Sequence, residues 1–415
     1  MFSFSSVSRS STFKLSFTPA YKNKTAARVD SRKRSNQKEK KSPISFFTNA
    51  FIGDAGIFIA TGALIAFSII MVYSTTGVLA AEKFSDSLFY VKRQIFAVFI
   101  GLVGLVCLSN VKISFFKKYS HLFLFACFLL LALPYLPGLG HAAGGARRWI
   151  NIGPVHLQPG EFVKLGFVIF IAGFFARHES RLNTFSQGVF KPVLLLIPVC
   201  AILLLQPDFG SAAILAGVTL CMASASGSRL RYILISGFCL SVAAAILIIS
   251  SPYRMNRIIS FLTPWADASG KGYQLIQSLI AIGSGQFSGV GLGASQQKLL
   301  FLPAAHTDFI FAVIAEELGF VGCLVLICVF LLFFWRGIKL ATKYAEDTFS
   351  FALCVGLTLL IVLPALLNMG VTTGMLPTKG LVLPLIGYGG SSIIASLFAV
   401  GILLSLAREF KKSVS

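Results

Sequence analysis

The stretch LLFLPAAHTDFIFAVIAEELG at 299–319 decides how the rest of the chain is interpreted. A polar triplet, His306-Thr307-Asp308, stands where a loop passes into a long apolar run, and Glu316 and Glu317 follow about two helical turns later. Ionisable groups are costly inside a bilayer, so groups at or within a membrane segment indicate function. Asp308 has a second interpretation, as a helix N-cap that faces water and is favoured by the helix dipole. The stretch alone favours neither interpretation.

The composition indicates an integral membrane protein. Hydrophobic residues make up 56% of the 415 residues and charged residues 12%, with a mean hydropathy of +0.82, whereas soluble domains carry roughly 25% charged residues. The net charge of +21 resides in a tail and in short loops, which indicates contact with anionic lipid headgroups and no nucleic acid. The eight cysteines lie in apolar runs without metal-type spacing, so we expect neither disulfides nor zinc.

Long apolar runs separated by short polar breaks predict an all-α fold with about ten transmembrane helices, since one span needs about 20 mainly apolar residues. The expected spans are 55–73, 94–109, 120–137, 162–176, 192–206, 209–225, 231–250, 309–334, 350–373 and 385–407. Lys and Arg concentrate in alternate loops, which places the N- and C-termini in the cytoplasm. The basic residues of the inner loops are Lys112, Lys117, Lys118, Arg177, Arg181, Lys191, Arg229, Arg231, Arg336, Lys339 and Lys343.

Three parts of the chain differ in composition. Residues 1–50 are rich in Ser, Lys and Arg and predict a disordered basic tail; a transit peptide is the alternative, because the first 29 residues contain no acid. Residues 51–408 form the membrane domain, and 409–415 a cytoplasmic tail. Residues 251–307 predict a large extracytoplasmic loop between helices 7 and 8, too long for a plain connection. Its apolar pattern at 273–282 predicts a helix with one face in lipid, followed by a glycine hinge.

The predicted topology brings polar stretches to the outer face at 144–164, 206–210, 251–307 and 376–380. Their basic residues oppose the positive-inside trend, and an anionic ligand is the simplest explanation. These residues are Arg147, Arg148, Lys164, Arg254, Arg257, Lys271, Lys298 and Lys379. A carboxylate among such cations suits transfer chemistry on a lipid-linked phosphate, because the cations stabilise the departing pyrophosphate and the carboxylate accepts a proton from the attacking hydroxyl.

Several of these polar residues also have structural interpretations. Glu161 and Lys164 are three apart on a helix and are expected to neutralise each other. Arg147 and Arg148 can equally anchor headgroups, and His306 is interpreted as a hydrogen-bonding loop residue, because no second His or Cys lies nearby for a metal. The groups expected to support the site without reacting are Gln158, Glu161, Asp208, Glu316 and Glu317.

Four long motifs resemble one known family: GARRWINIGPVHLQPGEFVK (145–164), QPDFG (206–210), GVGLGASQQKLLFLPAAHTDFIFAVIAEELG (289–319) and NMGVTTGMLPTKGLVLPLIGYGGSS (368–392). At these residues the chain is similar to the SEDS family (shape, elongation, division and sporulation), of the FtsW type, over about residues 55–407. Two positions depart from the family pattern: Ala304 stands where an acid is usual, and Gly387 where a serine is usual.

The resemblance implies a peptidoglycan glycosyltransferase that polymerises lipid II and releases undecaprenyl diphosphate during cell division. It implies that Asp308 is the catalytic residue, and that the substrate contacts Arg147, Arg148, Lys164, His306, Thr307 and Lys379. We expect a divalent cation, magnesium or manganese, and no organic cofactor. The expected partners are a class B penicillin-binding protein, other division proteins and membrane lipid.

The expected location is the bacterial inner membrane at the division septum, or a plastid membrane if the tail is a transit peptide. The alternative function is a lipid II flippase in which Glu316 and Glu317 line a polar path. Because most ionisable groups cluster on the outer face and not at the bilayer midplane, the sequence favours the enzyme.

Overall fold

The computed structural model describes residues 53–143, 146–152, 155–268, 270, 272–298 and 301–414. Residues Phe46–Ser415 form one compact unit, which contains every helix and strand described below. The predicted tail at 1–50 lies outside the described residues, as does Lys271.

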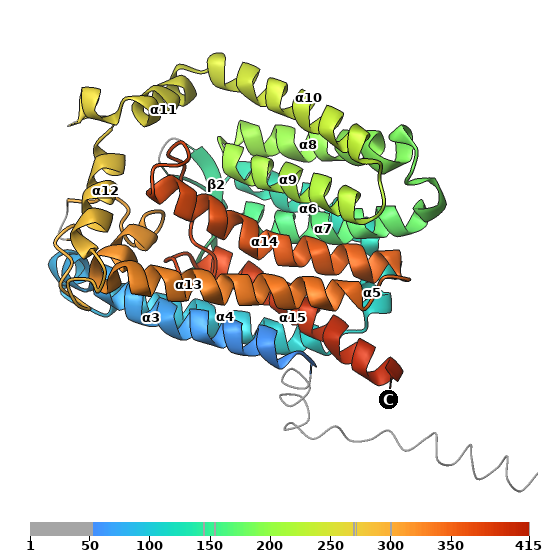
Figure 1. The fold of residues 1–415 in the computed structure, drawn as a ribbon, viewed down its shortest axis with the longest axis horizontal. Coiled ribbons are helices and arrows are strands. Elements are labelled where there is room, and N and C mark those ends of the chain that lie inside the picture. Colours follow the sequence, from blue (N-terminus) through green and yellow to red (C-terminus); the bar gives the residue numbers. More distant parts are fainter. Residues whose placement is uncertain are drawn as a thin grey trace, which may run out of the picture. The chain divides into compact units, whose positions relative to one another are not determined.

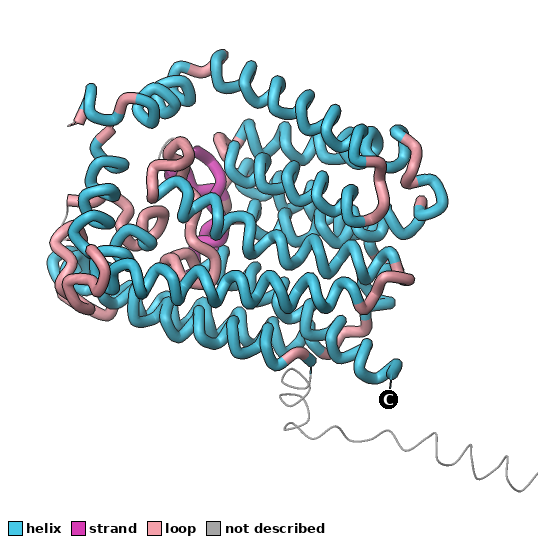
Figure 2. Tube along the Cα trace, viewed as in Figure 1, coloured by secondary structure: helices cyan, strands magenta, loops and turns pink. Residues whose placement is uncertain are grey.

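Each of the ten predicted spans overlaps one apolar helix of the described chain, although α6 ends at 132 and α15 begins at 390; Figures 1 and 2 show the arrangement of these helices. They are α3 (Ala55–Phe84), α4 (Phe89–Ser109), α6 (Ser120–Ala132), α7 (Pro159–Arg177), α8 (Lys191–Leu205), α9 (Phe209–Ala225), α10 (Leu230–Ile249), α13 (Ile310–Thr342), α14 (Thr348–Thr372) and α15 (Gly390–Val414). Eight helices of the described chain are long and apolar enough to cross a membrane, while the apolar helices at Ser120–Tyr135 and Phe209–Ala225 are shorter. The helical membrane fold is therefore confirmed, and the count of ten spans stays a prediction.

The helices pack through an apolar core. Helix α13 packs against α3 and α14, and α7 packs against α6 and α14, while α15 lies along α4; Figure 1 shows α3, α13 and α14 running side by side. Phe167 and Phe175 of α7, Phe333 of α13 and Phe349 of α14 are fully buried at these contacts. Helix α10 differs, since Ser236 is its only buried residue.

A small antiparallel sheet, in the order β1-β2-β3, adds to the predicted all-α fold. Its strands are β1 (Gly140–Ala143), β2 (Ala146–Ile152) and β3 (Val155–Leu157), drawn in magenta in Figure 2. The Trp and Ile residues of β2 favour a strand, and the sheet leads into α7 through β3. The β1–β2 register shifts between His141 and Ala142, which pair with Trp149 and Arg147, so Arg148 is the extra residue of a bulge in β2.

The segment predicted as a large loop contains α11 (Pro252–Leu262), a 3-10 turn (Pro264–Asp267) and α12 (Tyr273–Gly285). The predicted helix near 273–282 is confirmed. Leu275 and Ile276 are buried and α12 packs on α13 and α14, whereas Ile280 is exposed, so the lipid-facing orientation of one face stays a prediction. Short elements complete the fold: α5 (Ile113–Lys118), 3-10 turns at Leu133–Tyr135 and Glu179–Arg181, and a π-helical turn at Ser186–Phe190.

Candidate functional site

Asp308 lies in the turns just before α13 and does not cap that helix. The helix begins at Ile310, and its N-cap position, Phe309, makes no side-chain capping bond. By contrast, Asp54, Asp208 and Asp347 each accept a backbone N–H at the start of α3, α9 and α14. Within the described chain, the Asp308 carboxylate has no hydrogen-bond or ion-pair partner. The capping interpretation is therefore wrong for Asp308, whereas Asp208 does cap its helix.

The loop after α14 holds Asp308 in place. The Asn368 side-chain amide donates to the backbone carbonyl of Asp308 at 2.7 Å and to that of Leu381 at 2.5 Å. A Cβ added to Gly380 would lie 2.9 Å from Oδ2 of Asp308, so a side chain at 380 would collide with the carboxylate. The Lys379-Gly380-Leu381 segment thus lies directly against the acid.

The surroundings of Asp308 suit proton transfer. Burial raises the pKa of its carboxyl to about 6, and the positive charges of Arg257 and then Arg148 oppose that rise. The group is consequently ionised at neutral pH but accepts a proton more readily than an ordinary aspartate. A base whose pKa lies near the working pH is favoured for general base catalysis.

Lys379 lies against the start of α9. Its Nζ is 4.7 Å from the centroid of the Phe209 ring, and a Cβ at Gly210 would lie 3.0 Å from its Cε. Burial lowers the pKa of Lys379 to about 8; the charge of Asp208 opposes this shift, while Arg257 and Lys164 add to it. Lys379 is therefore a desolvated cation that is repelled by the charges of Arg257 and Lys164.

Three arginines complete this positive region. Arg148 on β2 is partly buried, and its Nε is buried without a hydrogen-bond partner among the described residues. Arg254 and Arg257, three apart on α11, lie toward the same region: the Arg254 guanidinium is 5.9 Å from the Phe209 centroid, and Arg257 donates to the carbonyl of Thr378 at 3.4 Å. The sequence identified both α11 arginines as outer cations but did not place them at the site. Their spacing of three residues could have indicated that they share one face of a helix.

Other predicted cations take part less directly. Arg147 is exposed, whereas its neighbour Arg148 is partly buried. Lys164 is buried and forms an ion pair with Glu161 at 2.8 Å, which confirms their predicted contact. The Gln158 amide donates to Oδ2 of Asp208 at 3.4 Å, so Gln158 supports the start of α9.

His306 and Thr307 form one wall beside Asp308. The centroid of the His306 ring lies 5.6 Å from that of Tyr90 and 5.8 Å from that of Tyr388. The backbone carbonyl of His306 accepts a hydrogen bond from the Tyr388 backbone N–H at 2.9 Å. Burial, and secondarily the charge of Lys83, lowers the pKa of His306. The Thr307 hydroxyl donates to the carbonyl of Ala304 at 3.2 Å. Both residues thus make the local contacts expected of loop residues, and their contact with substrate stays a prediction.

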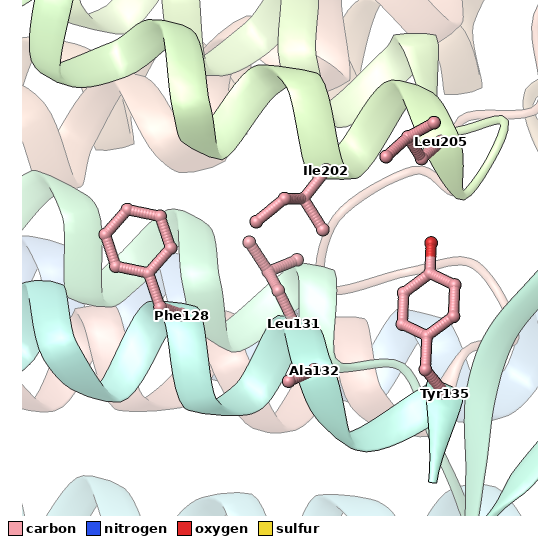
Figure 3. Close-up of a pocket in the computed structure, with 6 residues that line it drawn as sticks. All are labelled: Phe128, Leu131, Ala132, Tyr135, Ile202 and Leu205. Carbon is pink, nitrogen blue, oxygen red and sulfur yellow. The ribbon is translucent and has the colours of Figure 1, made fainter.

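Two cavities lie away from Asp308. An apolar cavity of about 280 Å³ lies between α6 and α8, lined by Phe128, Leu131, Ala132, Tyr135, Ile202 and Leu205 (Figure 3). A second, of about 20 Å³, is lined in part by Glu161 and Lys164. Asp308 lines neither of these two cavities.

The sequence matches the model of the cell cycle protein family that comprises FtsW, RodA and SpoVE, over residues 55–412. The chain belongs to this family. It is 42% identical over 349 residues to a probable peptidoglycan glycosyltransferase FtsW of Trichlorobacter lovleyi, covering 84% of this chain and 91% of the relative. It is 38% identical over 355 residues to the stage V sporulation protein E of Bacillus subtilis, covering 86% and 97%.

Two solved structures show the same fold. One, described as structural coordination of polymerization and crosslinking by a peptidoglycan synthase complex, has a TM-score of 0.70 at 30% identity, covering 86% of this chain and 98% of that chain. The other is the rod shape determining protein RodA of Thermus thermophilus, with a TM-score of 0.62 at 26% identity, covering 86% and 97%. Both likenesses span nearly the whole membrane region of this SEDS protein.

Proposed function

We propose that this SEDS protein is a peptidoglycan glycosyltransferase that polymerises lipid II into glycan strands during cell division. Its relatives named for that activity support the proposal. The observation that carries it is the state of Asp308: a desolvated carboxylate that caps nothing and lies against a loop bearing Lys379, under the charges of Arg148 and Arg257. A flippase would need no such unpaired acid beside a cationic surface.

In the proposed reaction, Asp308 accepts the proton of the sugar 4-hydroxyl of the acceptor lipid II. The hydroxyl oxygen forms a bond to the anomeric carbon of the growing chain, and the bond from that carbon to the diphosphate breaks. Undecaprenyl diphosphate leaves with the electron pair, and the anomeric configuration inverts. Diphosphate needs no proton to depart, so the second acid used in glycoside hydrolysis is dispensable.

The cations stabilise the leaving diphosphate. Lys379, Arg148 and Arg257 all act electrostatically on Asp308 or on one another, and Arg254 lies over the same Phe209 ring as Lys379. Preorganised cations in a water-poor site lower the energy of charge that develops in the transition state. The α11 arginines therefore join Arg148 and Lys379 in the proposed diphosphate site.

A divalent cation, magnesium or manganese, is part of the proposal. Magnesium in transferases is commonly held by one or two carboxylates together with substrate phosphates. Asp308 fits that role, and among the described residues no group of three or more His, Cys, Asp or Glu could hold a metal alone. When bound, the ion would supply charge neutralisation at the diphosphate. With Asp308 as its protein ligand, that carboxylate would orient the attacking hydroxyl through the ion, as the alternative to accepting its proton directly.

The proposal extends to partners and location. A structural relative is part of a peptidoglycan synthase complex that couples polymerisation to crosslinking, which supports a class B penicillin-binding protein as partner here, alongside other division proteins. The corresponding place is the bacterial inner membrane at the septum. A plastid membrane is the counterpart if the first 50 residues are a transit peptide.

Gel analysis of glycan products from lipid II tests the function. Purified wild type should polymerise lipid II with Mg²⁺ and lose that activity in EDTA, and Asp308→Ala should be inactive while retaining the elution volume of the folded protein. Ala304→Glu, which restores the acid usual in the family, is a neighbouring control that should remain active. Full polymerisation by Asp308→Ala would refute the assignment; lipid II translocation by vesicles containing that inactive variant would support the flippase instead.

A further inference from the structure

Helix α13 is interrupted at Gly319, whose φ of 64° and ψ of −162° are not helical. In a continuous helix the N–H groups of Phe320 and Val321 would donate to the carbonyls four residues earlier. Here they donate to the carbonyls of Gln286 and Phe287, at 3.0 and 3.2 Å. A distant part of the chain therefore takes the place of the preceding helical turn.

The exchange is reciprocal. The carbonyls of Glu316 and Glu317, which the break leaves without helical donors, accept the N–H groups of Val290 and Gly291, each at 3.0 Å. The segment 286–291 thus satisfies all four of these backbone groups, as buried backbone polar groups require. The glycine segment predicted to be a hinge is in fact inserted into the helix.

Glycine is required on both sides of this insertion. Gly289 has a φ of 79°, and a Cβ there would lie 2.2 Å from the carbonyl oxygen of Glu317. A Cβ on Gly319 would lie 2.3 Å from the Gly289 nitrogen. The two backbones approach as closely as the absence of side chains allows.

A buried ion pair closes the same junction. Nζ of Lys298 lies 2.8 Å from Oε1 of Glu317, with 6% and 0% of the two side chains exposed. The Ser74 hydroxyl of α3 donates to the same carboxylate at 2.6 Å. Lys298 follows the inserted segment 286–291 by seven residues, so the pair joins this part of the chain to α13 and, through Ser74, to α3.

Glu316 makes a parallel set of contacts. Its carboxylate accepts the Ser295 hydroxyl, and the Gln296 N–H at 3.0 Å. The adjacent glutamates thus bind two neighbouring turns of the 286–298 segment. Both buried carboxylates therefore have polar partners.

The break isolates a short helical piece, 310–318, from the remainder of α13, and Asp308 stands two residues before it. Nine helical residues span only about 13 Å. We propose that Lys298 and Glu317 are positioning residues, which set the place of Asp308 by fixing the far end of this short helix. Buried ion pairs contribute little net stability but can specify a single arrangement. The expected effect of this ion pair on the reaction rate rests on the proposed function. Its expected effect on the position of Asp308 does not.

A disulfide measures the position without catalysis. Because a Cβ at 380 would lie 3.7 Å from Cγ of Asp308, the double variant Asp308→Cys, Gly380→Cys should crosslink readily in the full-length protein, as peptide mapping by mass spectrometry would show. Adding Glu317→Gln or Lys298→Met should slow crosslinking at least tenfold. Adding Glu317→Asp, which keeps the charge on a shorter side chain, should also slow it.

The matched control is the ion pair of Arg336 with Asp54, at 2.8 Å, on the other side of the break in the same helix. Arg336→Gln should leave the crosslinking rate unchanged. In the enzyme that retains Asp308, Glu317→Asp should lower kcat for lipid II about tenfold with little change in KM, since small misplacements reduce rate more than binding. Equal crosslinking rates with and without Glu317→Asp would overturn the proposal, whatever the polymerase assay shows.

Discussion

Replacing Asp308 by Asn should make the folded protein more stable while removing its activity. Burial raises the pKa of this carboxyl from the ordinary 3.8 to about 6, a difference equivalent to about 3 kcal/mol at 1.36 kcal/mol per pH unit. A carboxyl whose pKa is raised by folding contributes to the free energy of unfolding, and that contribution is complete only below pH 3.8, where the group is protonated in both states. That contribution is lost as the pH rises through about 6. The ionised group therefore destabilises the fold at neutral pH.

Asp308→Asn removes that cost. Because the carboxylate is partly exposed, solvent screening reduces the expected gain to about 2 kcal/mol at pH 7.5, which is a rise of roughly 2 °C in Tm for a chain of this length. The gain should fall to about half at pH 5, since ionisation of the folded state is then largely suppressed. Thermal unfolding in detergent, followed by tryptophan fluorescence in EDTA, measures both values.

The control for this prediction is Asp208, an acid that does cap its helix. Its carboxylate accepts the N–H and the hydroxyl of Ser211, so Asp208→Ala should lose about 1 kcal/mol. Opposite signs for the two variants at pH 7.5 are expected. A loss of stability in Asp308→Asn at pH 7.5 would show that the carboxylate has a partner in the fold and would refute the reasoning.

Two further predictions concern the pH dependence of polymerisation. Activity should fall above about pH 8 as Lys379 loses its proton, and Lys379→Arg should keep activity at pH 9, because a guanidinium remains charged there; an unchanged alkaline limb in that variant would exclude Lys379 as its source. The charge of Arg257 lowers the pKa of both Asp308 and Lys379. Arg257→Gln should therefore move both the acid and the alkaline limb of the pH–rate profile to higher pH. A shift of one limb alone would contradict a shared site.

The helices were predictable from the sequence because hydropathy acts locally: every expected span overlaps a helix, and none extends beyond its helix by more than five residues. The break in α13 was not, since Gly319 lies in an apolar run and is non-helical only because 286–291 replaces its hydrogen bonds. The strand β2 was hidden for a similar reason, as its pairing depends on β1 and β3. Interactions between distant segments leave no periodic signal in either one.

The acid of the site was predictable from the sequence, but the set of cations around it was not. Asp308 stood out as an ionisable residue at the mouth of an apolar run. By contrast, the choice among eight outer cations depends on which of them have carboxylate partners. Lys164 and Lys298 lie in ion pairs with Glu161 and Glu317, and such pairs form only when the chain is folded.

The distribution of charge explains why an anion should bind at this place. Arg148, Arg254, Arg257 and Lys379 converge on a region whose acids are Asp208 and Asp308, which leaves an excess of two positive charges (four minus two) when both acids are ionised. Desolvation lowers the pKa of Lys379 to about 8, so the isolated protein holds that charge at a cost. A diphosphate carries the compensating charge, and its arrival would relieve the repulsion among the cations.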